Sequence, residues 1–191
     1  MKNRIGVWGD SITWGANDLE MGGWVARLRS FIDNEHELEP GVYNVGVSGD
    51  KVGNVLRRFG MEFEARQSET VILAIGINDS PHDTHPEGTP LDEFERQLGE
   101  LIQKAKAGAT KPVIFVGLTS VDDEHPKNSG YKNSEIKKYD EIVKKVTSGS
   151  KVTYLDVFDL ITKDDLKMDG LHPEAQGHEK IFQAVKAALG Y

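Results

Sequence analysis

Five short apolar segments alternate along the chain with longer segments in which apolar residues recur every three or four positions. The third and fourth apolar segments are continuous runs, which is typical of strands buried on both faces of a parallel sheet. The pattern therefore predicts a sheet of five parallel strands. The predicted strands are residues 5–8, 42–47, 71–75, 113–118 and 152–157.

The segments between and after these strands carry the three- and four-residue apolar spacing of amphipathic helices. The predicted helices include residues 24–32, 52–59, 91–105, 136–146 and 181–189. Because strand and helix alternate five times, we expect a doubly wound α/β sandwich and a single domain over residues 1–191. Two polar segments, 80–90 and 119–132, are predicted to be loops at the carboxyl edge of the sheet, where such folds bind ligands.

Composition narrows the class of partner. Hydrophobic residues make up 38% and charged residues 28% of the chain, which fits a folded globular protein rather than a disordered one. The net charge of −8 makes nucleic acid or an anionic membrane an unsuitable partner, because such binding requires clustered Lys and Arg. The chain has no Cys, so disulfides, thiolate metal sites and a cysteine nucleophile are excluded.

The cellular location follows only by default. The apolar segment 5–8 is too short for the hydrophobic region of a signal peptide, and no apolar run approaches the roughly 18 residues that span a membrane. We therefore expect a cytoplasmic protein, although a chain trimmed of a leader would look the same. The oligomeric state stays open.

A candidate nucleophile lies directly after the first predicted strand. Gly9, Asp10 and Ser11 form a polar turn that would place the Ser11 hydroxyl above the carboxyl end of the strand. By itself this tripeptide is weak evidence, since Asp10 and Ser11 are also residues that cap helices and build turns.

A candidate base and its partner lie after the last predicted strand. Asp169 precedes His172 by three residues in the segment 169–173, just before the final helix. A serine hydroxyl is a poor nucleophile unless a neutral imidazole takes its proton, and a carboxylate holds that imidazole in the required tautomer. The alternative is a capping arrangement in which Asp169 binds the amides of its turn.

Candidate donors for a negative oxygen follow the second and third strands. Gly49 allows a backbone N–H group to approach a ligand closely, and Asn78 offers an uncharged side-chain donor. With the Ser11 N–H group they are the predicted oxyanion hole. Because parallel strands bring their carboxyl ends to one edge, these four separate positions converge there, as acyl transfer requires.

In this order of motifs the chain resembles the SGNH, or GDSL-type, hydrolases over nearly its whole length. The family is defined by a serine, a glycine, an asparagine and a histidine in separate sequence blocks, and these match Ser11, Gly49, Asn78 and His172. Asp169 matches the acid of the family's catalytic triad. The resemblance implies a three-layer α/β/α, flavodoxin-like fold and hydrolysis of esters or thioesters through an acyl-enzyme, without cofactor or metal. It also implies a small-molecule ester substrate, with carbohydrate acetate esters among the candidates.

The chain departs from the family at Lys51, where a small polar residue is common, and we expect this change to tune the loop. Two rival functions remain. One is a flavodoxin-like module that binds an anion, against which the acidic Asp10 and the absence of a Gly-x-Gly-x-x-Gly motif argue. The other is a catalytically silent relative that binds sugars.

Several further side chains are candidates for contact with a substrate or a metal ion. Trp14, three residues beyond Ser11, is the best candidate for substrate contact, and Asp10 is a second one, although bracing of the turn suits it better. Asp79 is also interpreted as a brace. The remaining aromatic and imidazole candidates are interpreted as core or as solvent-facing loop residues rather than substrate or metal ligands: Trp24, Tyr43, His82, His85 and His125.

Overall fold

Five parallel strands form one sheet in the order β2-β1-β3-β4-β5. The structure is a computed structural model, and it describes residues 4–35, 41–150 and 152–191. The predicted five-stranded parallel sheet is confirmed, with strand ends shifted by at most two residues. The strands are β1 (Ile5–Gly9), β2 (Val42–Gly46), β3 (Thr70–Ala74), β4 (Val113–Val116) and β5 (Thr153–Leu155).

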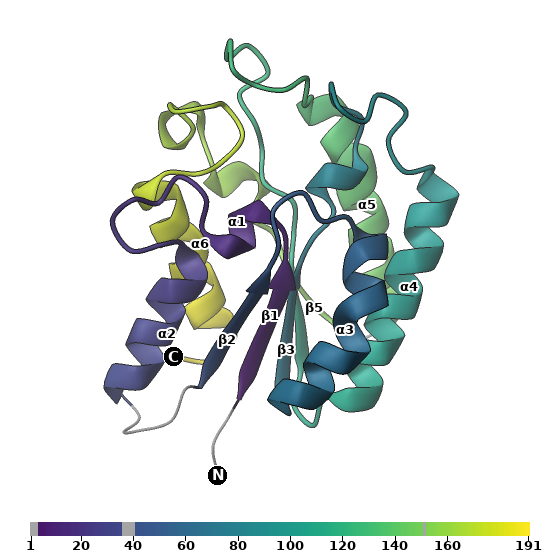
Figure 1. Ribbon diagram of the computed structural model, residues 1–191, viewed down its shortest axis with the longest axis vertical. Helices are drawn as coiled ribbons and strands as arrows, with labels where there is room; N and C mark the ends of the chain where they lie inside the picture. Colours follow the sequence, from purple (N-terminus) through teal and green to yellow (C-terminus); the bar gives the residue numbers. More distant parts are fainter. Residues whose placement is uncertain (1–3, 36–40, 151) are drawn as a thin grey trace.

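Helices cover both faces of the sheet (Figure 1), as the alternating pattern predicts. The pair α2 and α6 packs on one face, and α3, α4 and α5 pack side by side on the other. These helices are α2 (Trp24–Glu35), α3 (Val52–Arg66), α4 (Leu91–Gly108), α5 (Asn133–Ser150) and α6 (Ala175–Ala188). None of the helices in the described part of the chain is long and apolar enough to cross a membrane.

The short elements were not predicted. A single helical turn, α1 (Ser11–Trp14), follows β1, and three 3-10 turns stand in loops: η1 (Ile77–Asp79), η2 (Phe158–Leu160) and η3 (Lys163–Asp165). They are too short for a periodic apolar pattern, so periodicity could not reveal them.

The central strands supply a rigid base for the carboxyl edge. Every residue of β1 is buried, and Ile72 and Leu73 of β3 are fully inaccessible. The indole of Trp8 packs on Phe59 of α3, with ring centroids 4.7 Å apart. Burying each such side chain contributes about 1.5–3 kcal/mol. The strand ends are therefore fixed points from which the loops extend.

The loops that follow the strands gather at one edge of the sheet, at the top of Figure 1. The predicted loops 80–90 and 119–132 are both there and contain no helix or strand. They are tied together by the backbone bond from Asp83 N–H to Ser129 O, at 2.9 Å. The candidate site residues all lie on this edge.

Candidate active site

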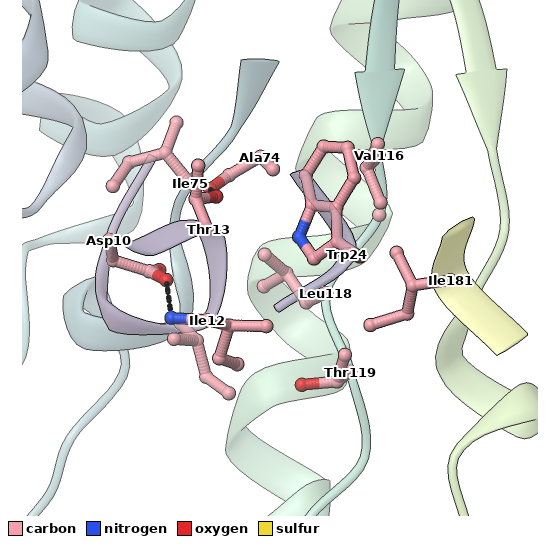
Figure 2. A pocket seen from close by; sticks show the side chains of 12 residues that line it. Asp10, Ile12, Thr13, Trp24, Ala74, Ile75, Val116, Leu118, Thr119 and Ile181 are labelled. Atoms are coloured by element: carbon pink, nitrogen blue, oxygen red, sulfur yellow. Dashed lines mark hydrogen bonds between the residues drawn. The ribbon is translucent and has the colours of Figure 1, made fainter. Parts of the chain in front are cut away.

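Ser11 is the first residue of α1, directly above the end of β1. The side chain of Asp10 caps this turn, because its Oδ1 accepts a 2.9 Å hydrogen bond from the Ile12 N–H group (Figure 2). Gly9 makes the turn sterically feasible, since a Cβ there would lie 2.0 Å from Thr13 Oγ1 and 2.3 Å from Ala74 O. The same turn therefore caps α1 and places the Ser11 hydroxyl above the end of β1.

The structure brings Ser11, His172 and Asp169 together as the sequence predicts. Ser11 Oγ lies 2.8 Å from His172 Nε2, and His172 Nδ1 lies 2.8 Å from Asp169 Oδ2. A carboxylate can only accept, so Nδ1 carries the ring proton and Nε2 is free to accept the proton of the serine hydroxyl. This is the arrangement in which an imidazole can act as a general base.

Asp169 both shapes its turn and orients the imidazole. Its Oδ1 accepts hydrogen bonds from the N–H groups of Leu171 (2.9 Å) and His172 (2.8 Å), while Oδ2 also accepts from Asn17 Nδ2 at 2.8 Å. Partial burial by itself raises the pKa of Asp169, but the N–H groups of His172 and Leu171 and the His172 ring lower it to a net value below the ordinary 3.8. Asp169 is therefore ionised at neutral pH.

Asn17 and His178 are parts of the site that sequence reasoning missed. Asn17 adopts the left-handed conformation (φ 66°) in the loop after α1. The buried His178 ring fixes that loop, because Nδ1 accepts from Trp24 N–H at 3.2 Å and Nε2–H donates to Ala16 O at 3.0 Å. Burial lowers the pKa of His178, so the ring stays neutral in this role. His178 lies three residues before Ile181 on the apolar face of α6, a spacing that does signal its burial.

The predicted oxyanion donors lie on loops that adjoin the end of β1. Gly49 has a positive φ of 81°, a conformation that favours glycine. Its loop is fastened to β1, because Val47 N–H donates to Gly9 O at 3.0 Å and Arg58 bonds both Asp50 Oδ2 (2.8 Å) and Gly9 O (3.3 Å). Within the described residues, the N–H groups of Ser11 and Gly49 have no protein acceptor. They are therefore free to donate to a substrate oxygen.

Asn78 lies on η1, and the residue is only 6% exposed. One N–H bond of Nδ2 donates to Asp50 O at 3.0 Å, and Oδ1 accepts from the Tyr131 hydroxyl at 2.6 Å. The amide has a second N–H bond, which these two contacts leave for a ligand. Tyr131 is a further neighbour of the site that the sequence did not point to.

The prediction that Asp10 binds substrate is not supported, because the residue is only 3% exposed and its carboxylate is engaged in the cap. Its role is the bracing one. Asp79 is also a brace, since it accepts from Val52 N–H (2.9 Å) and the Thr89 hydroxyl (2.8 Å). Burial raises the pKa of Asp10 to about 7 and that of Asp79 to about 6, and the charge of Asp79 adds to the effect on Asp10.

The aromatic candidates differ in exposure. Trp14 is 59% exposed beside Ser11, which leaves its ring accessible to a substrate, and Trp24 is a core residue at 1%. Tyr43 is partly buried against the same core. A cavity of about 20 Å³ lies beneath α1 (Figure 2), with room for about one water molecule.

The histidines of the two loops are less exposed than predicted. His82 stacks on Tyr131 with ring centroids 4.4 Å apart, and it pairs through its backbone with His85. His125 is partly buried, because its ring contacts Lys167 O at 3.1 Å. These rings face neighbouring loops because the loops pack on one another. In the described ranges, no group of three or more His, Asp or Glu residues could hold a metal ion.

A serine, an imidazole and a carboxylate in one hydrogen-bonded series, at the carboxyl edge of a doubly wound sheet, are typical of the serine hydrolases. The chain belongs to the GDSL-like lipase/acylhydrolase family, whose model matches residues 7–180. The prediction of that family and of its fold is confirmed.

Relatives of known activity are esterases. An arylesterase of Vibrio mimicus is 26% identical over 190 residues, which are 97% of this chain and 88% of the relative. A multidomain esterase of Ruminococcus flavefaciens is 32% identical over 120 residues, which are 59% of this chain and only 14% of that protein. Together with the family match, these similarities identify the chain as a carboxylic ester hydrolase. They give no support to a non-catalytic binding module.

Among solved structures, the acetylxylan esterase of Geobacillus stearothermophilus matches with a TM-score of 0.77 and 22% identity. The match covers 100% of this chain and 97% of that protein. At this identity the likeness concerns the fold, and it agrees with the sheet and helix layers described above.

Proposed function

We propose that the chain hydrolyses small carboxylic esters through an acyl-enzyme formed on Ser11. The observation that carries this proposal is the pair of 2.8 Å contacts that joins Ser11 Oγ to His172 and His172 to Asp169. No rearrangement is needed before a proton can move from the hydroxyl to the imidazole.

The first half of the reaction transfers the acyl group to the serine. As Ser11 Oγ attacks the acyl carbon, His172 Nε2 takes the hydroxyl proton, and Asp169 stabilises the imidazolium that forms. The negative carbonyl oxygen is held by the N–H groups of Ser11 and Gly49 and by the amide of Asn78. The bond between the acyl carbon and the leaving oxygen then breaks, and His172 returns the proton to that oxygen.

The second half regenerates the serine. A water molecule gives one proton to His172 as its oxygen attacks the acyl carbon, and the same donors hold the negative oxygen again. The bond to Ser11 Oγ breaks, the proton returns to that oxygen, and a carboxylic acid leaves. The chain's own side chains supply every proton transfer.

For the substrate, we propose an acetyl or similarly short acyl group on a polyhydroxylated alcohol. A groove of about 350 Å³ lies next to the triad, because Asn17, whose amide donates to Asp169, is one of the residues that line it. Its lining includes Glu20, Glu174 and Gln176.

The chemistry of this groove suits sugar hydroxyl groups. The groove is lined by carboxylates and amides, among them Glu20, Glu174 and Gln176, and these groups can accept hydrogen bonds from hydroxyl groups. The exposed ring of Trp14, three residues beyond Ser11, offers a flat apolar surface. The name of the acetylxylan esterase with the same fold supports a carbohydrate acetate as substrate.

A panel of substrates tests the proposal. Aryl acetate, butyrate and octanoate esters are assayed beside an acetylated xylooligosaccharide, with Ser11→Ala as the control. We expect kcat/KM to fall at least about 10-fold from acetate to octanoate, and acetate to be released from the oligosaccharide. Equal or better hydrolysis of octanoate would contradict the short-acyl proposal, and full activity of Ser11→Ala would contradict the mechanism.

A further inference from the structure

We propose that Tyr131 is a positioning residue that holds the Asn78 amide in the orientation required of an oxyanion-hole donor. The inference rests on the proposed function of Asn78 and adds a residue from a third loop to the site. Tyr131 belongs to the loop 119–132 after β4, and it reaches Asn78 across 53 positions of the sequence.

The contacts of the Asn78 amide leave only one orientation satisfied. Oδ1 accepts from the Tyr131 hydroxyl at 2.6 Å, and Nδ2 donates to Asp50 O at 3.0 Å. A rotation of the amide by half a turn would set Oδ1 against the Asp50 carbonyl oxygen, where two acceptors repel. The second N–H group of Nδ2 has no acceptor among the described residues, so this orientation keeps it available as a donor.

Tyr131 contributes more than steric support. Without its hydroxyl, Asn78 Oδ1 would be a buried acceptor with no donor, and rotation of the amide toward other partners would be favoured. A donor on the amide oxygen also polarises the group and makes its remaining N–H group a stronger hydrogen-bond donor. Both effects act through Asn78, and neither requires Tyr131 to touch the substrate.

Tyr131 is itself held firmly. The residue is 4% exposed, its ring stacks on His82 at an interplanar angle of 14°, and its backbone N–H donates to Asn128 Oδ1 at 2.9 Å. Burial raises the pKa of Tyr131, so the hydroxyl keeps its proton and remains a donor. The loop 80–90 thus supports the tyrosine whose hydroxyl fixes the amide.

The test is Tyr131→Phe, which removes only the hydroxyl. We expect kcat on an aryl acetate to fall about 10-fold with KM within about 2-fold, because the loss concerns the negative oxygen of the transition state. Tyr154→Phe is the matched control, since Tyr154 also donates its hydroxyl to a side chain, the Asp140 carboxylate, from the edge strand β5. We expect kcat of this control to be unchanged.

A double-mutant cycle separates positioning from general support of the fold. In an Asn78→Ala background, measured with a fluorogenic acetate ester, Tyr131→Phe should reduce kcat less than 2-fold, because the group it positions is gone. A fall of equal size in both backgrounds, or an unchanged kcat in the single variant, would overturn the inference. Full activity of Asn78→Ala would instead refute the proposed oxyanion hole.

A second variant covers the case in which Tyr131→Phe is unfolded at the assay temperature. His82→Ala removes the ring on which Tyr131 stacks and leaves the hydroxyl. We expect a fall in kcat of about 3-fold in the parent and none in the Asn78→Ala background. The same fall in both backgrounds would also overturn the inference.

Discussion

The two sides of Ser11 are built differently. His172 and Asp169 belong to one turn, three residues apart, and the carboxylate binds the amides of that same turn. On the other side, Gly49 and Asn78 stand on loops after two different strands, and Tyr131 joins them from a third. The acid–base side is therefore a local structure, whereas the oxyanion side depends on contacts between loops. Variants should act on the two sides in different ways.

The largest effect is expected where the two sides meet, at the reacting pair. Ser11→Ala and His172→Ala should each lower kcat by about 10⁴-fold or more, because the hydroxyl and the base act as a unit. The double variant should be no slower than either single one. Steady-state kinetics on an aryl acetate, with circular dichroism to confirm folding, checks this. An additive loss in the double variant would contradict a shared step.

Asp169→Asn should have the next largest effect on kcat. It tests whether Asp169 acts on His172 or only stabilises its own turn. An Asn side chain still accepts from one neighbour, but it removes the charge and favours the wrong ring tautomer of His172. We expect kcat to fall by about 10³–10⁴-fold, less than for either member of the reacting pair, with little change in melting temperature. A fall below about 10-fold would show that the carboxylate is a turn residue only.

Asn17→Gly probes a long-range contact on the acid–base side. Glycine accepts the positive φ of 66° without strain, so the variant removes only the amide that donates to Asp169. We expect kcat to fall about 3- to 10-fold, with the low-pH limb of the kcat profile moved to higher pH, because the carboxylate loses a donor. The profile is measured beside Gln67→Gly, a remote residue that also has a positive φ, of 49°. Identical profiles for Asn17→Gly and the parent would contradict the role of Asn17.

The smallest effect on activity is expected from Asp10→Asn. Asp10 caps the turn that carries Ser11 and belongs to neither side of the site. The folded state holds the Asp10 proton up to a pKa of about 7, whereas the unfolded chain releases it near the ordinary 3.8. The free energy of unfolding should therefore fall as pH rises from about 4 to about 7. The variant lacks this contribution, so the melting temperature of the variant minus that of the parent should rise by about 10 °C over that range. Parallel melting curves would contradict the raised pKa.

The difference between the two sides also explains what the sequence could predict. The sequence places Ser11 directly after a predicted strand, and it places Asp169 and His172 just before a predicted helix. The topology alone therefore brings these three residues to one edge of the sheet. The N–H donors of Gly49 and Asn78 were predictable for the same reason. Asn17 and Tyr131 were not, because each acts through a loop whose path is set by distant contacts. The exposure of His82 and His85 was predicted wrongly for that reason also, since a polar loop gives no sign that it packs on another.

The central claim is that Ser11 carries the acyl group during turnover. The most direct measurement is mass spectrometry of the protein quenched in acid within the first turnovers of an aryl acetate. The account predicts one added acetyl group on the peptide that contains Ser11, and none in Ser11→Ala. Turnover without an adduct on that peptide, or an adduct that persists in Ser11→Ala at the parent's rate of hydrolysis, would contradict it.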